Sequence, residues 1–155
     1  MSNNRVALSL FGSAFLLTLA LATAHAAKPA TPKAQLEKEA THILLGKVQS
    51  ISFSRNTADQ WEITIYIAEI KVDKVEKGSG VNAGDVVQVR YVSNAWRGAS
   101  PPPEGDSGHR PTPKQDDYVR VYLVNQGYNG AGYTTDGRYD VYYNNGFQIL
   151  APRIK

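Results

Sequence analysis

Apolar and polar residues alternate with a period of two along most of the chain beyond Thr41, and this alternation is typical of half-buried β-strands. Trp61, Ile63, Ile65 and Ile67 show it most clearly. No segment carries a long apolar stripe with the 3.6-residue period of a helix, so we expect an all-β fold of five or six strands. The pattern predicts strands over residues 43–53, 61–72, 87–91, 118–124, 139–143 and 147–150. Alternation in the third and fourth of these strands predicts that Val89 and Val121 face inward and that Arg90 faces outward.

In two of these predicted strands the apolar residues change face partway along. Leu44 and Val48 share one face but Ile51 lies on the other, so we expect a bulge near residues 49–50. The strand over residues 61–72 shows the same change. A switch of the buried face suits a strand that bends around the corner of a small barrel.

Turns and irregular segments separate the strands. Residues 55–60 read as a turn, and residues 93–116 and 125–138 read as two long loops rich in Gly with Pro or Tyr. Loops longer than about 12–15 residues are uncommon in compact domains and often carry function. A hairpin is predicted at Asn144–Gly146, because Asn and Gly tolerate positive φ.

The sequence before the first strand reads as a flexible lead-in, residues 27–40. Residues 35–40 could form a turn or two of helix, but Leu36 is their only large apolar residue, so we expect weak anchoring. Residues 41–155 are then one domain. We predict a small five- or six-stranded antiparallel OB-like barrel with two long loops and at most a short N-terminal helix.

Residues 1–26 have the features of an export signal. Arg5 supplies the charge, residues 6–22 are predominantly apolar, and Ala24 and Ala26 fit the small-x-small rule, so we expect cleavage after Ala26. An uncleaved anchor is the alternative, but the apolar run is slightly shorter than the ~20 residues of a membrane span. The mature protein is expected to be periplasmic or secreted, with no stable membrane span.

Composition narrows the chemistry. The chain has 155 residues and no cysteine, which excludes disulfides, iron–sulfur sites, thiol nucleophiles and cysteine-ligated zinc. Of the 17 Lys and Arg residues only Arg5 lies in the leader, so 16 remain against 14 Asp and Glu, a net charge of +2. That charge does not demand a polyanionic partner, so we do not expect nucleic acid, although OB-type barrels often bind it. Only His42 and His109 follow the leader, and we expect no metal and no cofactor.

Four short segments carry a resemblance to a known family. They are Leu45–Val48 (LGKV), Val72–Gly78 (VDKVEKG), Gly84–Val89 (GDVVQV) and Tyr118–Leu123 (YVRVYL). Over roughly residues 41–124 the chain resembles small exported bacterial OB-type barrels that are similar to the tissue-inhibitor-of-metalloproteinases and netrin modules. The inhibitor family uses a mature N-terminal cysteine to reach a protease's zinc. This chain has no cysteine, so the resemblance does not imply inhibition by that route.

One motif raises the question of catalysis. Gly105–Gly108 (GDSG) matches the nucleophile loop of chymotrypsin-like serine proteases, except that His109 follows it. That mechanism needs a His base, an orienting Asp and an oxyanion hole, and its fold needs two barrels. His42, the only histidine between the leader and this loop, lacks the usual flanking residues. We therefore expect no enzyme; the alternative is a small hydrolase centred on residues 93–116 with His109 as the base.

The aromatic residues point to binding. All nine Tyr follow the leader, and most of them lie in the C-terminal third. Tyr and Arg are favoured at recognition surfaces, although Tyr also suits a half-buried sheet. One patch would require a long loop to fold back over the fourth strand, whose Arg120 and Tyr122 we expect to face outward. The candidate ligand-binding residues are Trp96, Arg97, His109, Arg120, Tyr122, Tyr128 and Tyr133.

These observations favour an exported, non-enzymatic binding or interaction module of the cell envelope. Its ligand would be an envelope protein, a peptide or a glycan. A structural envelope component is a further alternative, which self-association through an open strand edge would favour.

Overall fold

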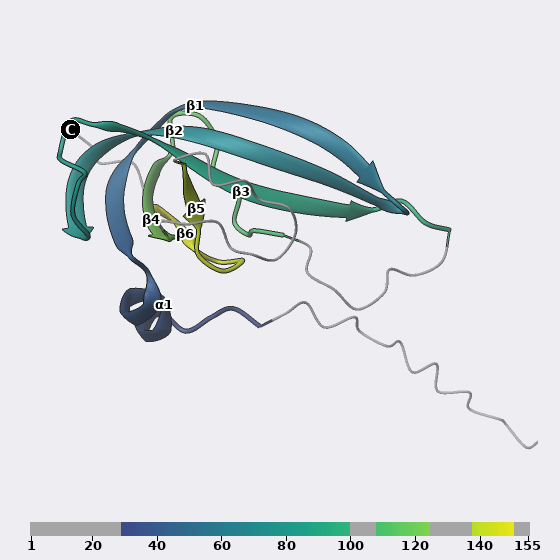
Figure 1. Cartoon of the computed structure of the whole chain (residues 1–155), viewed down its shortest axis with the longest axis horizontal. Coiled ribbons are helices and arrows are strands. Elements are labelled where there is room, and N and C mark those ends of the chain that lie inside the picture. Colours follow the sequence, from purple (N-terminus) through teal and green to yellow (C-terminus); the bar gives the residue numbers. More distant parts are fainter. Residues whose placement is uncertain (1–28, 100–107, 125–137, 151–155) are drawn as a thin grey trace, which may run out of the picture.

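The structure is a computed structural model that describes residues 29–99, 108–124 and 138–150. The all-β prediction is confirmed, with six strands and one short helix. In this part of the chain no helix has the length and apolar character that a membrane span requires. The predicted leader lies outside the described residues. The elements, shown in Figure 1, are α1 (Lys33–Glu39), β1 (His42–Ala58), β2 (Trp61–Lys77), β3 (Val86–Trp96), β4 (Tyr118–Val124), β5 (Tyr139–Val141) and β6 (Phe147–Leu150).

Five of the strands join into a closed ring. β1 pairs with β2, β2 with β3, β3 with β5, β5 with β4, and β4 with β1, while β6 adds to β4. All pairs are antiparallel except β3 with β5, which is parallel at Val89–Tyr139 and Arg90–Asp140. The prediction of a wholly antiparallel sheet is therefore wrong at this pair. The reason is geometric: strand direction cannot alternate around a closed ring with an odd number of members.

The inward side chains of the ring form the main core. Inward alternation was predicted for β3 and β4, and it is confirmed because Val89, Val119 and Val121 are completely buried. Two aromatic rings, Tyr91 and Phe147, meet edge to face within this core, their centroids 5.1 Å apart. The other fully buried core side chains include Leu44, Val48, Ala68, Ile70 and Leu123.

One of the two predicted changes of face is confirmed and the other is wrong. In β1 the pairing with β2 shifts between Val48 and Ser50, which is the expected bulge. In β2 the pairing with β3 runs without a shift from Trp61–Trp96 to Lys71–Val86. The odd-numbered and even-numbered apolar residues of β2 therefore lie on opposite faces of one regular strand.

β1, β2 and β3 extend together well beyond the ring, as Figure 1 shows. The predicted turn over residues 55–60 is wrong in extent, because β1 continues to Ala58 and only Asp59 and Gln60 turn. β3 likewise runs on to Trp96, into the predicted loop. We call residues 50–58, 61–67 and 92–96 the arm.

The predicted C-terminal hairpin is wrong. β5 and β6 do not pair with each other, because both pair with β4, β5 at Leu123–Val124 and β6 at Tyr118–Val121. The positive φ between them, 53°, belongs to Tyr143 rather than to the Asn-Gly turn.

Candidate interaction surface

The structure separates the residues that were predicted to form one ligand-binding patch. Trp96 and Arg97 lie at the tip of the arm, where Trp96 pairs with Trp61 at the start of β2. Arg120 instead forms an ion pair with Glu76, near the far end of β2. At roughly 3.3 Å per residue, about 50 Å of strand lies between Trp61 and Glu76. Two further candidates, Tyr128 and Tyr133, lie outside the described residues.

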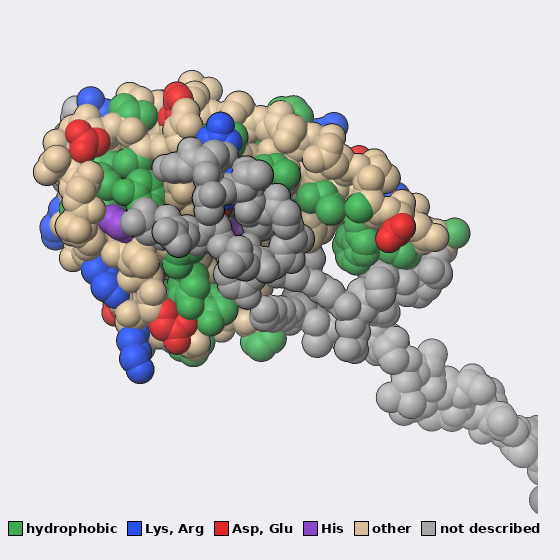
Figure 2. Space-filling model, viewed as in Figure 1, with side chains coloured by type: hydrophobic (Ala, Val, Ile, Leu, Met, Phe, Trp, Pro, Cys, Tyr) green, Lys and Arg blue, Asp and Glu red, His purple; other side chains and the backbone are tan. Residues whose placement is uncertain are grey.

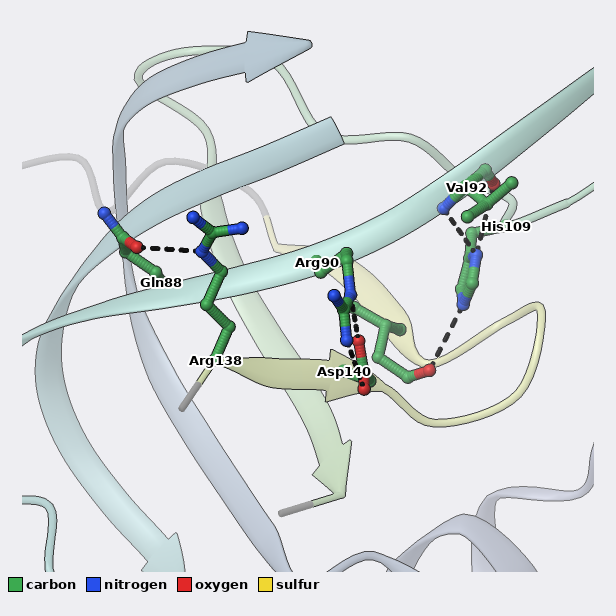
Figure 3. A network of polar contacts seen from close by, with 7 residues as sticks. Gln88, Arg90, Val92, His109, Arg138 and Asp140 are labelled. Carbon is green, nitrogen blue, oxygen red and sulfur yellow. Dashed lines mark hydrogen bonds and ion pairs between the residues drawn. The ribbon is translucent and has the colours of Figure 1, made fainter. Parts of the chain in front are cut away.

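The His109 side chain links β3 to β5 through contacts with the backbone of both strands. Its Nδ1 accepts a hydrogen bond from the backbone N–H of Val92 at 3.0 Å, and its Nε2 lies 3.2 Å from the backbone oxygen of Val141. Nδ1 also lies 3.1 Å from the backbone oxygen of Val92, so the direction of these contacts depends on the tautomer: with the proton on Nε2, Nδ1 accepts from Val92 and Nε2 donates to Val141. Figure 3 shows the His109 ring beside Val92 of β3, with a further dashed line from the ring to a backbone oxygen. Both ring nitrogens are therefore occupied by backbone groups.

Arg120 and Tyr122 face outward from the main core, as predicted, but α1 rather than a long loop covers this side of β4. Tyr122 is completely buried against Leu36 and Ala40. Arg120, with 18% of its side chain exposed, bridges Glu76 at 2.6 Å and Glu37 of α1 at 3.3 Å.

α1 is anchored to the sheet more firmly than we expect from a helix with one large apolar residue. Leu36 is 1% exposed, and the Lys77 ammonium donates to the backbone oxygens of Glu37 and Lys38. The Tyr142 hydroxyl donates to Glu39 at 2.7 Å, and this hydrogen bond holds the pKa of that carboxyl below its ordinary value. Polar contacts from Lys77 and Tyr142, which are distant in the sequence, thus stabilise a helix that has only one large apolar side chain of its own.

A buried ion pair links β3 to β5, and sequence reasoning missed it. Alternation predicts that Arg90 faces outward, yet its side chain and that of Asp140 are each only 6% exposed. The guanidinium donates to both carboxylate oxygens, at 2.6 and 3.1 Å (Figure 3). Arg138 nearby donates to Gln88 at 3.2 Å. The parallel pairing of β3 with β5 places Arg90 beside Asp140. Alternation within one strand carries no information about this pairing.

The outer face of the arm, turned away from the ring core, carries an apolar stripe. The continuous β2–β3 register places its members on this face, opposite the core residue Ala68. Along β1 the neighbouring positions on the same face are small and polar, Ser52, Ser54 and Asn56. Figure 2 shows hydrophobic side chains at the surface of this projecting end. The apolar stripe consists of Trp61, Ile63, Ile65, Ile67 and Trp96, each only partly buried.

The tip of the arm holds the stripe's two largest side chains in place. The indoles of Trp61 and Trp96 meet edge to face with centroids 5.1 Å apart. Beside them the Arg97 guanidinium pairs with Glu62 at 3.0 Å, and the Arg97 N–H donates to the Gln60 oxygen. Two rigid aromatic rings at an exposed end are a typical anchor for a binding partner.

The inner face of the arm carries a row of aromatic rings that leads out from the core. Tyr91 stacks on Tyr66 with centroids 4.9 Å apart, and Tyr66 contacts Phe53 at 6.0 Å. The row ends at Phe53, which is 58% exposed and carries the Arg55 guanidinium 5.1 Å above its ring. The arm thus presents hydrophobic groups on both faces.

The described residues hold no group of three or more His, Asp or Glu side chains arranged to bind a metal ion. A shallow hollow at the start of β3 is lined by Gly80, Asp85, Gln88 and Arg138, among others. No family model matches this chain, and no curated protein or solved structure matches it either.

Proposed function

We propose that this protein is an exported, non-enzymatic interaction module that binds another protein through its arm. The observation that carries the proposal is the apolar stripe. An aliphatic and aromatic surface on an element that projects from the ring favours a partner with apolar side chains of its own. The resemblance to OB-type modules is compatible with this role, and it remains an expectation.

Burial of the stripe would supply the binding energy. Apolar surface removed from water contributes about 25 cal/mol per Å², so the partly buried Ile and Trp side chains of the stripe have some stabilisation left to gain. Paired tryptophans suit the centre of such a contact, because large rigid rings lose little conformational entropy on binding. An aliphatic stripe favours a protein segment over a glycan, whose hydroxyl groups would be left without partners against isoleucine.

The hydrolase alternative gains no support from the geometry of His109. A general base needs a ring nitrogen within hydrogen-bond reach of the proton that it removes. Both nitrogens of His109 are engaged with the backbone of β3 and of Val141.

The proposal is tested by a photo-crosslinking amino acid placed at Ile65, in cells that export the protein. We expect a discrete adduct whose mass differs from that of two copies of the chain. The matched control carries the same amino acid at Asn82, an exposed position in the turn before β3, and should give no such adduct.

A second variant separates a specific contact from chance proximity. Ile63→Lys places a charge in the stripe at a partly exposed position, so the fold should survive while the Ile65 adduct disappears. An adduct that persists in this variant, or one that forms equally from position 82, would contradict the proposal.

Export is part of the same proposal. We expect the mature protein to begin at Ala27, in the periplasm or the medium, because of the small-x-small site that follows the apolar run. Intact-mass measurement decides this, since a full-length chain retained in the membrane would contradict it.

A further inference from the structure

The outer edge of β1 in the arm has no strand beside it among the described residues. β1 pairs with β4 only from His42 to Lys47, and the backbone of Val48 bonds to Asp116 and Asp117. From Ser50 to Ala58 its strand partner is β2 alone. Every residue from Ser52 to Ala58 is exposed. The edge therefore presents unpaired backbone N–H and C=O groups to solvent.

This edge lacks the features by which proteins usually block strand pairing. Such features are prolines, lysines, very short strands and bulges along the edge. The segment from Ser50 to Ala58 contains no proline and no lysine, and the register shifts between β1 and β2 all lie before it, the last between Val48 and Ser50. Its only charged residue is Arg55. An open edge of this kind can accept a further strand.

We propose that the added strand is β1 of a second copy, running antiparallel with its two-fold axis at Ser54. This register pairs the whole of Ser50–Ala58 with itself. It places Phe53 opposite Arg55 of the other copy, and Ser52 opposite Asn56. The interaction surface is separate from the apolar stripe, so the inference goes beyond the proposed function and does not depend on it.

The charges and rings of the edge favour this register. Within one copy the Arg55 guanidinium already lies 5.1 Å from the centre of the Phe53 ring. In the dimer the arginine of each copy would lie across from Phe53 of the other, which repeats that cation–π contact between the copies. Moving the axis by one residue to Arg55 would instead place two arginines opposite each other, which is destabilising.

Pairing would also continue two features of the arm. The aromatic row from Tyr91 through Tyr66 to Phe53 would gain an arginine of the other copy at its exposed end. The two arms would form one continuous sheet, and because the axis is perpendicular to it, both apolar stripes would lie on the same face.

Two charge variants at the proposed axis test the inference. Ser54→Lys and Ser54→Asp each set like charges directly opposite one another in the dimer, at an exposed position where the monomer fold should be unaffected. The protein is produced from the full chain and examined by sedimentation over a range of concentrations. We expect the parent to dimerise, each variant to self-associate about tenfold more weakly or worse, and an equal mixture of the two variants to recover dimers.

Cysteine variants test the register, because the natural chain contains no cysteine. Ser54→Cys should crosslink to itself under mild oxidation or with a short bismaleimide. The matched control Ala58→Cys lies on the same exposed edge, but its two copies would be about 25 Å apart along the strands. A parent that stays monomeric, a mixture of charge variants that recovers nothing, or equal crosslinking at 54 and 58 would overturn the proposal. The Ile65 photo-adduct is measured only in chains that keep Ser54, because Ser54 lies opposite Ile65 on the face that carries the stripe.

Discussion

Arg90 and Asp140 form the polar contact whose loss should destabilise the fold most. Both side chains are almost fully buried and they meet through two hydrogen bonds. Asp140→Ala would leave the guanidinium buried without this carboxylate, so we expect the free energy of unfolding to fall by about 3–5 kcal/mol. Denaturant unfolding measures the change.

An exposed ion pair provides the control for that prediction. Arg97, with 62% of its side chain exposed, pairs with Glu62 at the arm tip. Arg97→Ala should lower the unfolding free energy by less than about 1 kcal/mol, because solvent screens the pair. Equal losses in the two variants would mean that Arg90 and Asp140 are not buried as described.

The buried tyrosines make stability depend on pH in the alkaline range. Burial raises the pKa of the Tyr91 hydroxyl well above its ordinary value of 10.0, and burial also raises the pKa of Tyr122. In the unfolded chain these hydroxyls ionise near pH 10, whereas in the folded protein they stay protonated. Their contribution is therefore complete below pH 10 and is lost as the pH rises above it.

Tyr91→Phe tests this dependence while keeping the aromatic ring in the core. We expect the fall in melting temperature between pH 10 and pH 11 to be smaller in the variant than in the parent. Tyr122→Phe should behave similarly, and at pH 7 it should cost little, since the Tyr122 hydroxyl is buried and has no hydrogen-bond partner among the described residues. Parallel pH profiles for parent and variants would count against the buried placement.

At the scale of single elements, α1 shows how tertiary contacts decide whether a helix persists. Seven residues are too few for a stable isolated helix. Leu36→Ala removes its buried anchor over Tyr122, so we expect a loss of about 2–3 kcal/mol in unfolding free energy. The control Lys38→Ala alters an exposed side chain of the same helix and should change stability by less than about 0.5 kcal/mol. Equal losses would indicate that α1 is not packed on β4.

Alternation predicted the elements better than it predicted their partners. It correctly assigned Val89 and Val121 to the core and the bulge near Gln49, because these depend on local periodicity. It did not reveal that β5 and β6 both pair with β4, since pairing between distant segments leaves no periodic signal.

Alternation also fails to show which apolar or polar face of a strand is covered, so it predicts a candidate surface on β4 rather than on the arm. Ile63 and Ile65 were recognised as one face of a strand, but an apolar face was assumed to be a buried face. Alternation correctly places Arg120 and Tyr122 outside the main core, but nothing in their own strand reveals that α1 covers them. Position in a strand thus predicts which side a residue faces, but it does not predict what lies over that side.

At the scale of the whole molecule, the ring and the arm differ in what they contribute to the protein. The ring holds the buried core, whereas the arm holds the partly exposed apolar stripe and the open edge of β1. Residues at the arm tip can therefore be changed with little effect on the core. We propose that binding depends on the arm and that stability depends on the ring.

Backbone hydrogen exchange tests this division most directly, with the protein compared in dilute buffer and in an envelope extract of its native cell. We predict slower exchange in the extract over residues 50–67 and 92–96, with no change over Tyr118–Val124 in the ring. Dilution keeps the reference sample monomeric, so protection in the arm reports contact with a partner or a second copy. Unchanged exchange in the arm, or protection confined to the ring strands, would contradict the claim that the arm is the interaction surface.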